Sequence, residues 1–554
     1  MKLSKAFFKT IFILQFFSIL FISNQSAAYP NPERKSMTLR KADPELCVAI
    51  RGNGELIMAH MNSVSRVLEH FGFFDGIAGG SSGSVTSFLY ESALQNPALW
   101  DCPSCTQQDF AFRAALMMKS LWAYVDIVKK SDDFAAVFDL ASSVNKIAED
   151  LKKKGITADK IHTLNPTQML ELSSNILKLL NSSDIKNLLN PEIISFLKNP
   201  ANIELFKFRL KEVLASIETF GSFDASDRRI FFRPGIISFP SVVSRFARIA
   251  NFLAGRGGSH YYDHSGMKEF LDQCSTKAVG LQWKELVALD KNCDAKIKSL
   301  MITYRNKAIA KEIDVDSRLN DFVGQYTHTL ISSGLLEENE SKEFLKGFSL
   351  YKDNNGFENF KFDIFNKIKF AYWGHDADLN KLNQNINKFD DLKTQKSHSL
   401  YNARWKTALL ASISEPGLSR FLELPNTNMV TAAGWTDLAP VLVLKNIGCK
   451  KVFYITRQGA DSPFGRGIAA NLGMTKEEDF KLYELSNPQS SLSRSLKEAN
   501  AVWCTNWNAH PVATDIQGLD DDSYHAPLIA PKPLFVEAYP RYKKQSPIGP
   551  EGCF

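Results

Sequence analysis

The stretch from Cys47 to Tyr90, CVAIRGNGELIMAHMNSVSRVLEHFGFFDGIAGGSSGSVTSFLY, decides the fold. It begins with a short apolar run typical of a buried strand, followed by the loop Arg51-Gly52-Asn53-Gly54. Apolar residues at helical spacing then extend from Leu56 to Phe71. A second apolar pair, Ile77-Ala78, leads into a glycine-rich turn and another helical pattern. Strands that alternate with helices indicate a parallel sheet covered by helices, so we predict an α/β fold.

The same texture returns near the carboxyl end of the chain. Apolar runs predict strands at 429–433, 451–456 and 501–504, and a helix at 438–444. The residues between are mostly helical in pattern, with a polar, loop-like stretch from Asp376 to Ser397. We therefore predict a three-layer α/β/α sheet formed by 45–100 and 401–554, interrupted by a long, mainly helical insertion at 106–400. The apolar face of the insertion either packs as core or forms a lid or membrane-facing patch.

Composition places the chain among ordinary globular proteins. It has 554 residues, of which 44% are apolar and 23% charged, which excludes disordered and collagen-like classes. The length allows roughly two to four domains, or one large α/β unit with insertions. The net charge of +6 falls to +3 (63 basic against 60 acidic residues) without Lys2, Lys5 and Lys9. This near-neutral balance lacks the basic footprint of a nucleic-acid-binding protein.

The first 28 residues have the parts of a secretory signal peptide. Three lysines precede a twelve-residue apolar core, Ile11–Ile22, and the small residues Ser26-Ala27-Ala28 follow it. The core is too short to cross a bilayer comfortably, although an uncleaved anchor is the alternative. We predict cleavage after Ala28 and export to a periplasmic or extracellular location.

Export changes the interpretation of the cysteines. Their even number in an oxidising compartment predicts disulfide bonds. Cys102-Pro-Ser-Cys105 has the spacing of a redox pair, but it lies in a polar turn, which favours a structural staple. No second pair or histidine cluster at zinc spacing accompanies it. The eight positions are Cys47, Cys102, Cys105, Cys274, Cys293, Cys449, Cys504 and Cys553.

The strongest chemical signal is Gly79-Gly80-Ser81-Ser82-Gly83. It matches the nucleophile elbow, in which a serine sits on a tight turn between a strand and a helix. Side chains at Gly79 or Gly83 would clash with the strand and helix that form the turn. The helix that follows directs its amino terminus at Ser81 and favours negative charge there. The alternative is an ordinary tight turn.

A second glycine loop supplies the other half of an acyl-transfer site. The oxyanion of the reaction needs N–H donors aimed at it in advance, and each is worth about 3 kcal/mol. Bare backbone after a strand can approach a substrate closely. We predict that Gly52, Asn53 and Gly54 form this oxyanion hole.

These residues resemble the start of the patatin-like phospholipase family. In that family a glycine-rich oxyanion loop precedes an elbow of the type Asp-x-Ile-Ala-Gly-x-Ser-x-Gly, which 75–83 match. A second match lies downstream, where 411–418 (ASISEPGL) is similar to the family's Ala-Ser-x-x-x-Pro segment. The resemblance covers about 150 residues at the two ends of the predicted sheet. It implies a Ser–Asp dyad that works without histidine.

The resemblance carries the nucleophile onto Ser81 and leaves the aspartate to be found. The family's Asp-Gly-Gly falls near Ala432-Ala433-Gly434, where no carboxylate stands, so Asp437 is the nearest candidate base. A helix N-cap is the alternative role for Asp437. Other candidate bases are Asp515 and the run Asp520-Asp521-Asp522.

Taken together, the sequence predicts a secreted lipid acyl hydrolase of phospholipase A or lysophospholipase type. Its substrate would be membrane or micellar lipid, and the reaction would need no metal or organic cofactor. Two alternatives remain. One is a non-catalytic, secreted binding protein with the same fold. The other is an α/β-hydrolase with the chain order Ser81, Asp437 and then His510 or His525.

Overall fold

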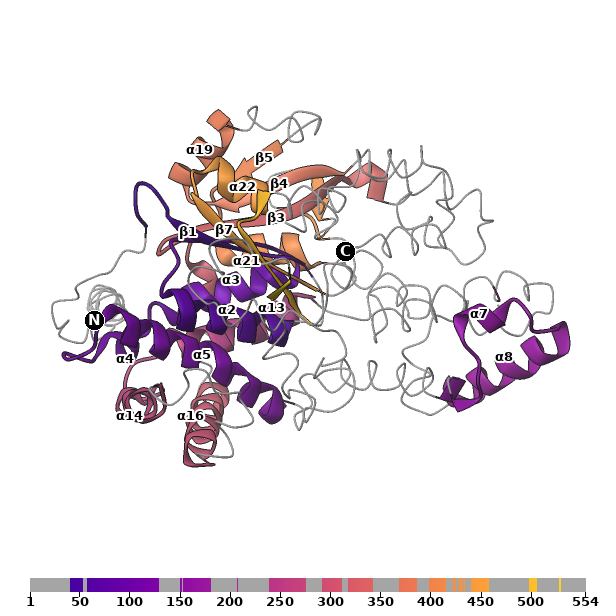
Figure 1. Cartoon of the computed structure of the whole chain (residues 1–554), viewed down its shortest axis with the longest axis horizontal. Coiled ribbons are helices and arrows are strands. Elements are labelled where there is room, and N and C mark those ends of the chain that lie inside the picture. The colour runs from indigo at the N-terminus through magenta and orange to yellow at the C-terminus, as the bar shows by residue number, and fades with distance from the viewer. Residues whose placement is uncertain are drawn as a thin grey trace, which may run out of the picture. The chain divides into compact units, whose positions relative to one another are not determined.

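The structure of the chain is a computed structural model, drawn in Figure 1. It describes residues 40–52, 57–128, 150–151, 153–180, 207, 239–275, 291–310, 317–341, 368–385, 398–414, 422–424, 428–431, 433, 440–457, 498–505 and 528–529. The predicted signal peptide lies outside these residues.

One mixed, mostly parallel sheet organises the described part of the chain. Its strands run in the order β5-β4-β3-β2-β1-β7-β8-β9, and β6 pairs with β3 off this path. The pairs that involve β1 and β2 are all parallel, whereas β4 and β6 run antiparallel to β3 and β9 antiparallel to β8. The strands are β1 (Leu46–Ile50), β2 (Gly76–Gly80), β3 (His328–Glu337), β4 (Lys369–Gly374), β5 (His398–Tyr401), β6 (Met429–Thr431), β7 (Lys451–Arg457), β8 (Ala501–Thr505) and β9 (Leu528–Ile529).

Helices cover both faces of the sheet (Figure 1). On one face, α19 (Asp376–Asn385) and α22 (Val441–Asn446) pack on alternate residues of the central strands, among them Cys47, Ala49 and Ala78. The opposite face is covered by helices that contact β2, β3 and β8. These are α2 (Ile57–Phe71), α3 (Ser82–Ala93) and α21 (Trp405–Ile413), with α5 (Gln107–Val128) packed on α2 and α13 (Phe239–Leu253) on α3.

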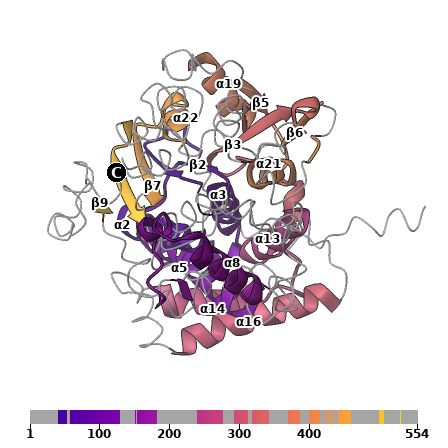
Figure 2. The same ribbon diagram turned by 90° about the vertical axis from the view of Figure 1, so that its right-hand side faces the viewer.

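The remaining described helices fall within the predicted insertion, except α4, which lies just before it. In Figure 2, α14 and α16 lie below α5. A disulfide between Cys274 and Cys293 joins α14 to α16. These helices are α4 (Pro97–Trp100), α7 (Ala158–Ile161), α8 (Pro166–Leu180), α14 (His264–Cys274), α16 (Lys291–Ala310) and the 3-10 turn η4 (Ser317–Asn320).

Disulfide bonds link parts of the chain as the cysteine content predicts. Cys47 on β1 is bonded to Cys449, which precedes β7, across 402 residues of sequence. Cys102 and Cys105 are bonded within their turn, in agreement with the predicted staple. These bonds fit an oxidising, non-cytoplasmic environment. None of the helices in the described ranges has the length and apolar character to cross a bilayer.

The sheet returns earlier in the chain than the sequence predicts. The strands β3 and β4 lie inside 106–400, the stretch predicted as a mainly helical insertion, and β5 begins there, so the sheet resumes at His328 rather than at residue 401. The predicted loop after Asp376 is also corrected, because 376–385 form α19. This helix buries only Asp378, Leu379 and Leu382, so its polar remainder hides the helical pattern.

Candidate active site

Ser81 lies at the turn from β2 into α3, as the elbow pattern predicts. Its backbone has φ 51° and ψ −122°, a region that costs a non-glycine residue about 1–3 kcal/mol. An ordinary N-cap serine is extended and accepts a hydrogen bond from the first helical turn. Ser81 makes no such side-chain cap, although it occupies the N-cap position. Strain without capping distinguishes this turn from a routine helix start.

Gly79 and Gly83 are required by close packing around the turn. A Cβ on Gly79 would lie 2.3 Å from the carbonyl carbon and oxygen of Gly83. A Cβ on Gly83 would lie 2.5 Å from the backbone oxygen of Ile50 on β1. Both obstacles are backbone atoms, which cannot rotate away. The glycines therefore allow α3 to start directly against β1 and β2.

Hydrogen bonds fix the backbone on each side of Ser81. Its N–H donates to Ser412 Oγ at 2.8 Å, and Ser412 lies 331 residues away on α21. Its carbonyl accepts from Ser84 Oγ at 2.6 Å and from the Ser84 N–H at 3.0 Å. Ser412 belongs to 411–418, the second segment on which the predicted family resemblance rests. The fold thus brings the two matching segments into contact.

The end of β6 approaches the same place. Gly80 on β2 is paired with Ser332 on β3, and Thr431 on β6 is paired with Leu335. Because β4 occupies the other edge of β3, β2 and β6 lie along one edge and their carboxyl ends face each other. Between them, Ala433 accepts a hydrogen bond from the Gly334 N–H. Ala433 is also strained, with φ 51°.

The predicted oxyanion loop is described only at its start. Gly52 follows β1, whose last residue Ile50 pairs with Gly79, so it lies at the same sheet edge as Ser81. The Arg51 N–H donates to the Ile455 carbonyl on β7 at 2.9 Å and so is not aimed at a substrate. Asn53 and Gly54 lie outside the described residues.

The candidate bases are not described. Asp437 falls in 434–439, and Asp515, Asp520-Asp521-Asp522, His510 and His525 fall in 506–527, all outside the described ranges. The dyad, the alternative triad and the N-cap role of Asp437 therefore stay predictions.

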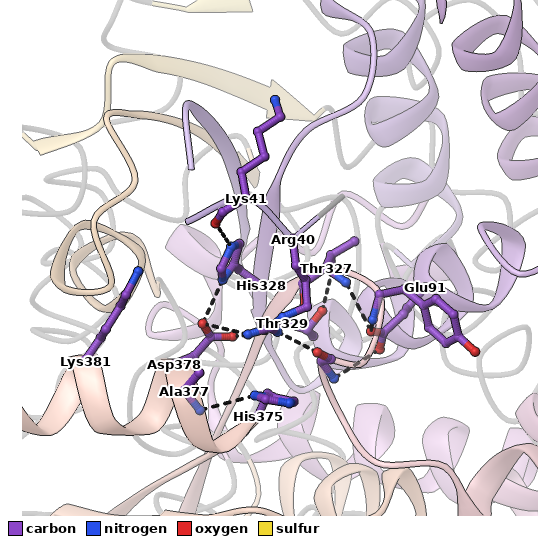
Figure 3. A network of polar contacts seen from close by, with 12 residues as sticks. Arg40, Lys41, Glu91, Thr327, His328, Thr329, His375, Ala377, Asp378 and Lys381 are labelled. Atoms are coloured by element: carbon purple, nitrogen blue, oxygen red, sulfur yellow. Dashed lines mark hydrogen bonds and ion pairs between the residues drawn. The ribbon is translucent and has the colours of Figure 1, made fainter. Parts of the chain in front are cut away.

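A histidine–aspartate pair is present, but at the other end of the sheet (Figure 3). His328 Nδ1 lies 2.7 Å from Asp378 Oδ1, and its Nε2 lies 2.7 Å from the Lys41 carbonyl. His328 pairs with Gly76, the first residue of β2, which places it ~13 Å along the strand from Gly80. This pair cannot contact Ser81.

The contacts around that pair identify a structural clamp. Arg40 donates to both oxygens of Asp378, at 3.0 and 3.2 Å, and to the carbonyls of Gly324 and Thr327. Each ring nitrogen of His328 lies within hydrogen-bond distance of an oxygen atom, so both nitrogens are engaged within the fold. The clamp ties residues 40 and 41 to the start of β3.

Glu91 reinforces the amino-terminal edge from α3. Its carboxylate accepts from the N–H groups of Tyr326 at 2.8 Å and of Gly324 at 3.2 Å, and it interacts electrostatically with Arg318. Figure 3 shows Glu91 beside Thr327, whose N–H it also accepts from. Burial raises the pKa of the Glu91 carboxyl, despite the opposing effect of Arg318. These groups shape the loop before β3, and Glu91 lies ~15 Å from Ser81 along α3.

Asp75, the acidic residue of the elbow motif, also has a structural role at the amino-terminal edge of the sheet. Its Oδ2 accepts from the Glu45 N–H at 2.7 Å, and its Oδ1 lies 2.8 Å from Lys41 Nζ. It therefore fixes the entry to β1 at the edge opposite Ser81.

Ser412 and Ser332 are the residues at the elbow that the sequence did not single out. Ser412 Oγ donates to the Ser332 carbonyl at 2.8 Å, while its oxygen accepts from Ser81. The one local signal is the run of small residues Ser332-Ser333-Gly334 within a buried strand. Nothing in the sequence pattern pairs that run with Ser412.

Neither a metal site nor a similar known protein accompanies the elbow in the residues that the structure describes. Within the described ranges, no group of three or more His, Cys, Asp or Glu side chains could hold a metal ion. A scan against protein-family models and searches of curated proteins and of solved structures find no match to this chain.

Proposed function

We propose that the chain is a serine acyl hydrolase that cleaves carboxylic esters of lipids, with Ser81 as its nucleophile. The single observation that carries the proposal is the strained backbone of Ser81, φ 51° and ψ −122°, at a glycine-flanked turn into a helix. Strain of this kind persists where the surrounding structure enforces it, and it concentrates at functional sites.

The predicted base is compatible with this geometry. Ala433, at the end of β6, lies beside Gly334 where β2 and β6 converge. Asp437 follows four residues later, and four residues span at most ~14 Å. We propose Asp437 as the base that accepts the Ser81 proton.

The proposed reaction has two steps. Ser81 Oγ attacks the ester carbonyl carbon and its proton passes to Asp437, while N–H groups of the Gly52–Gly54 loop stabilise the oxyanion. The C–O bond to the alcohol then breaks, and the alcohol leaves with the proton from Asp437. Water, activated by the same carboxylate, hydrolyses the acyl-enzyme and releases the fatty acid and free Ser81.

The lipid character of the substrate rests on the resemblance to patatin-like phospholipases. That resemblance gains support from the contact between its two matching segments, Ser81 and Ser412. Export, with lipid at a membrane or micelle surface as substrate, is part of the same proposal.

Product analysis tests this function. The protein is incubated with mixed phospholipid vesicles in H₂¹⁸O, and released products are identified by mass spectrometry. We expect free fatty acid that carries ¹⁸O in its carboxyl group, together with lysophospholipid. Ser81→Ala and Asp437→Asn should each lose this release by at least about 10³-fold. Ser82→Ala, which removes the next hydroxyl in the turn, is the matched control and should keep it.

Other outcomes would distinguish the alternatives. Loss of release in His510→Ala or His525→Ala by a similar factor would favour an α/β-hydrolase triad. Wild-type protein that binds vesicles but releases no fatty acid would contradict the hydrolase and favour a binding protein.

A further inference from the structure

The Ser412 hydroxyl occupies an unusual place in the sheet. The parallel register pairs Gly80 with Ser332, and the bond from the His328 N–H to the Asp75 carbonyl sets the alternation of the ladder. Continued regularly, this ladder would direct the Ser81 N–H at the Ser332 carbonyl. Instead, Ser412 Oγ stands between them, 2.8 Å from the Ser81 nitrogen and 2.8 Å from the Ser332 oxygen.

This insertion fixes the orientation of the hydroxyl. Its one proton points at the Ser332 carbonyl, so a lone pair is left to accept from Ser81. Ser412 is completely buried, and so is Ser332. Water therefore cannot easily replace the hydroxyl, and both backbone groups would lose their partner if it were removed.

The position of α21 explains why the bridge is rigid. This helix packs on β3, α3 and β6, so Ser412 is held by the elements that border the elbow (Figure 2). On the other side of Ser81, Ser84 holds the carbonyl from within α3. The strained residue is thus anchored at its N–H by α21 and at its C=O by α3.

We propose that Ser412 is a positioning residue, which holds Ser81 in its strained conformation by bridging the Ser81 N–H to the Ser332 carbonyl. This inference rests on the proposed function for its catalytic consequence. It also means that the Ser81 N–H bonds within the fold, so the proposed donors to the oxyanion are those of the Gly52–Gly54 loop. The contacts that fix the Ser81 backbone are therefore separate from its hydroxyl group, the proposed nucleophile.

Three variants test the role of Ser412. Ser412→Ala removes the bridge, and Ser412→Thr retains a hydroxyl as the conservative variant. Ser120→Ala is the matched control, because Ser120 is also buried and donates one hydrogen bond, to Met117 at 2.8 Å on α5, without touching the elbow. Each is compared with wild type at temperatures well below its own unfolding midpoint.

The first measurement is the rate at which a fluorophosphonate labels Ser81. We expect Ser412→Ala to lower the maximal labelling rate about 10- to 100-fold, with the half-saturating concentration nearly unchanged. On lipid ester, the same variant should lower kcat and leave KM nearly unchanged. Ser412→Thr should restore part of the rate, and Ser120→Ala should label like wild type.

The second measurement is independent of activity. Amide hydrogen exchange, followed by mass spectrometry of peptides that cover 77–88, reports the protection of the Ser81 N–H. We expect exchange there to be at least about 10-fold faster in Ser412→Ala than in Ser120→Ala.

The outcomes distinguish the positioning role of Ser412 from the proposed hydrolase function. Unchanged exchange at Ser81 in Ser412→Ala would overturn the positioning role, as would equal slowing of labelling by Ser412→Ala and Ser120→Ala. Wild-type protein that takes no label would overturn the proposed hydrolase, and the exchange data alone would then decide whether Ser412 holds the turn.

Discussion

The two edges of the sheet differ in what their polar residues do. At the amino-terminal edge, the side chains form hydrogen bonds with one another and with nearby carbonyls. They are those of His328, Asp378 and Arg40 (Figure 3). At the carboxyl-terminal edge, the elbow contains a strained serine and close-packed glycines. Two serine hydroxyls there form hydrogen bonds with the backbone of Ser81.

This difference is the reason why we place the proposed nucleophile at the elbow and not among the charged residues of the amino-terminal edge. A histidine–aspartate pair looks catalytic, yet both ring nitrogens of His328 are used for the fold. At the elbow, hydrogen bonds and close packing hold the backbone of Ser81 in a strained conformation. A serine nucleophile on a sharp turn, as we propose for acyl transfer, requires such a backbone. The following substitutions separate the two edges experimentally.

The largest expected effect is on activity at the carboxyl-terminal edge. Ser81→Ala should lower ester hydrolysis at least about 10³-fold, because the nucleophile is removed. His328→Asn, measured below its unfolding midpoint, should stay within about threefold of wild type. Comparable losses in both would show that the two edges are not functionally separate.

The amino-terminal edge should instead respond in stability. Asp378→Asn leaves Arg40 and His328 without their buried carboxylate, and we expect a loss of about 3–5 kcal/mol in the free energy of unfolding. Urea denaturation measures it. The exposed pair Lys369–Glu337 provides the control, since Glu337→Gln should cost less than about 1 kcal/mol. A small loss in Asp378→Asn would count against the clamp.

Packing at the elbow should couple stability to reactivity. Gly83→Ala forces a methyl group against the Ile50 carbonyl, and we expect about 1–3 kcal/mol of destabilisation together with slower labelling of Ser81. Gly258→Ala is the control, because no atom lies within 4 Å of the new Cβ, although its φ of +68° makes it mildly destabilising. Its labelling rate should match wild type, and slowing there as large as in Gly83→Ala would refute the packing argument.

The smallest effect concerns pH at the amino-terminal edge. Burial raises the pKa of Glu91, so the folded protein retains a proton that the unfolded chain releases. The associated stability is present below the ordinary pKa of glutamate, about 4.3, and is lost as pH rises through the folded value. Relative to Glu91→Gln, wild type should become less stable over this rise in pH. The exposed Glu338→Gln should show no such trend, and a flat difference for Glu91→Gln would contradict the shift.

Local patterns were sufficient to predict β1, β2 and β7 and the turn that carries Ser81. The runs at 47–50 and 451–456 are β1 and β7, and the glycines around Ser81 predicted its turn because steric demands there are local. The strand β3 escaped prediction, since Ser332-Ser333-Gly334 interrupts its apolar character and its pairing is set by distant segments.

The contacts of the site were less accessible from the sequence. Ser412 reaches Ser81 across 331 residues, and only the folded sheet brings α21 to that turn. The resemblance pointed to both segments without giving Ser412 a role. Conversely, Asp75 belongs to the matching motif but serves the opposite edge, because five residues of β2 separate it from Ser81.

The central claim is that Ser81 is the reactive residue, and mapping a covalent adduct tests it most directly. Folded protein is treated with a fluorophosphonate, digested and sequenced by tandem mass spectrometry, with urea-unfolded protein treated in parallel. We expect one phosphonylated residue, Ser81, in the folded sample and none after unfolding. An adduct on another serine, or no adduct on folded protein, would contradict the account.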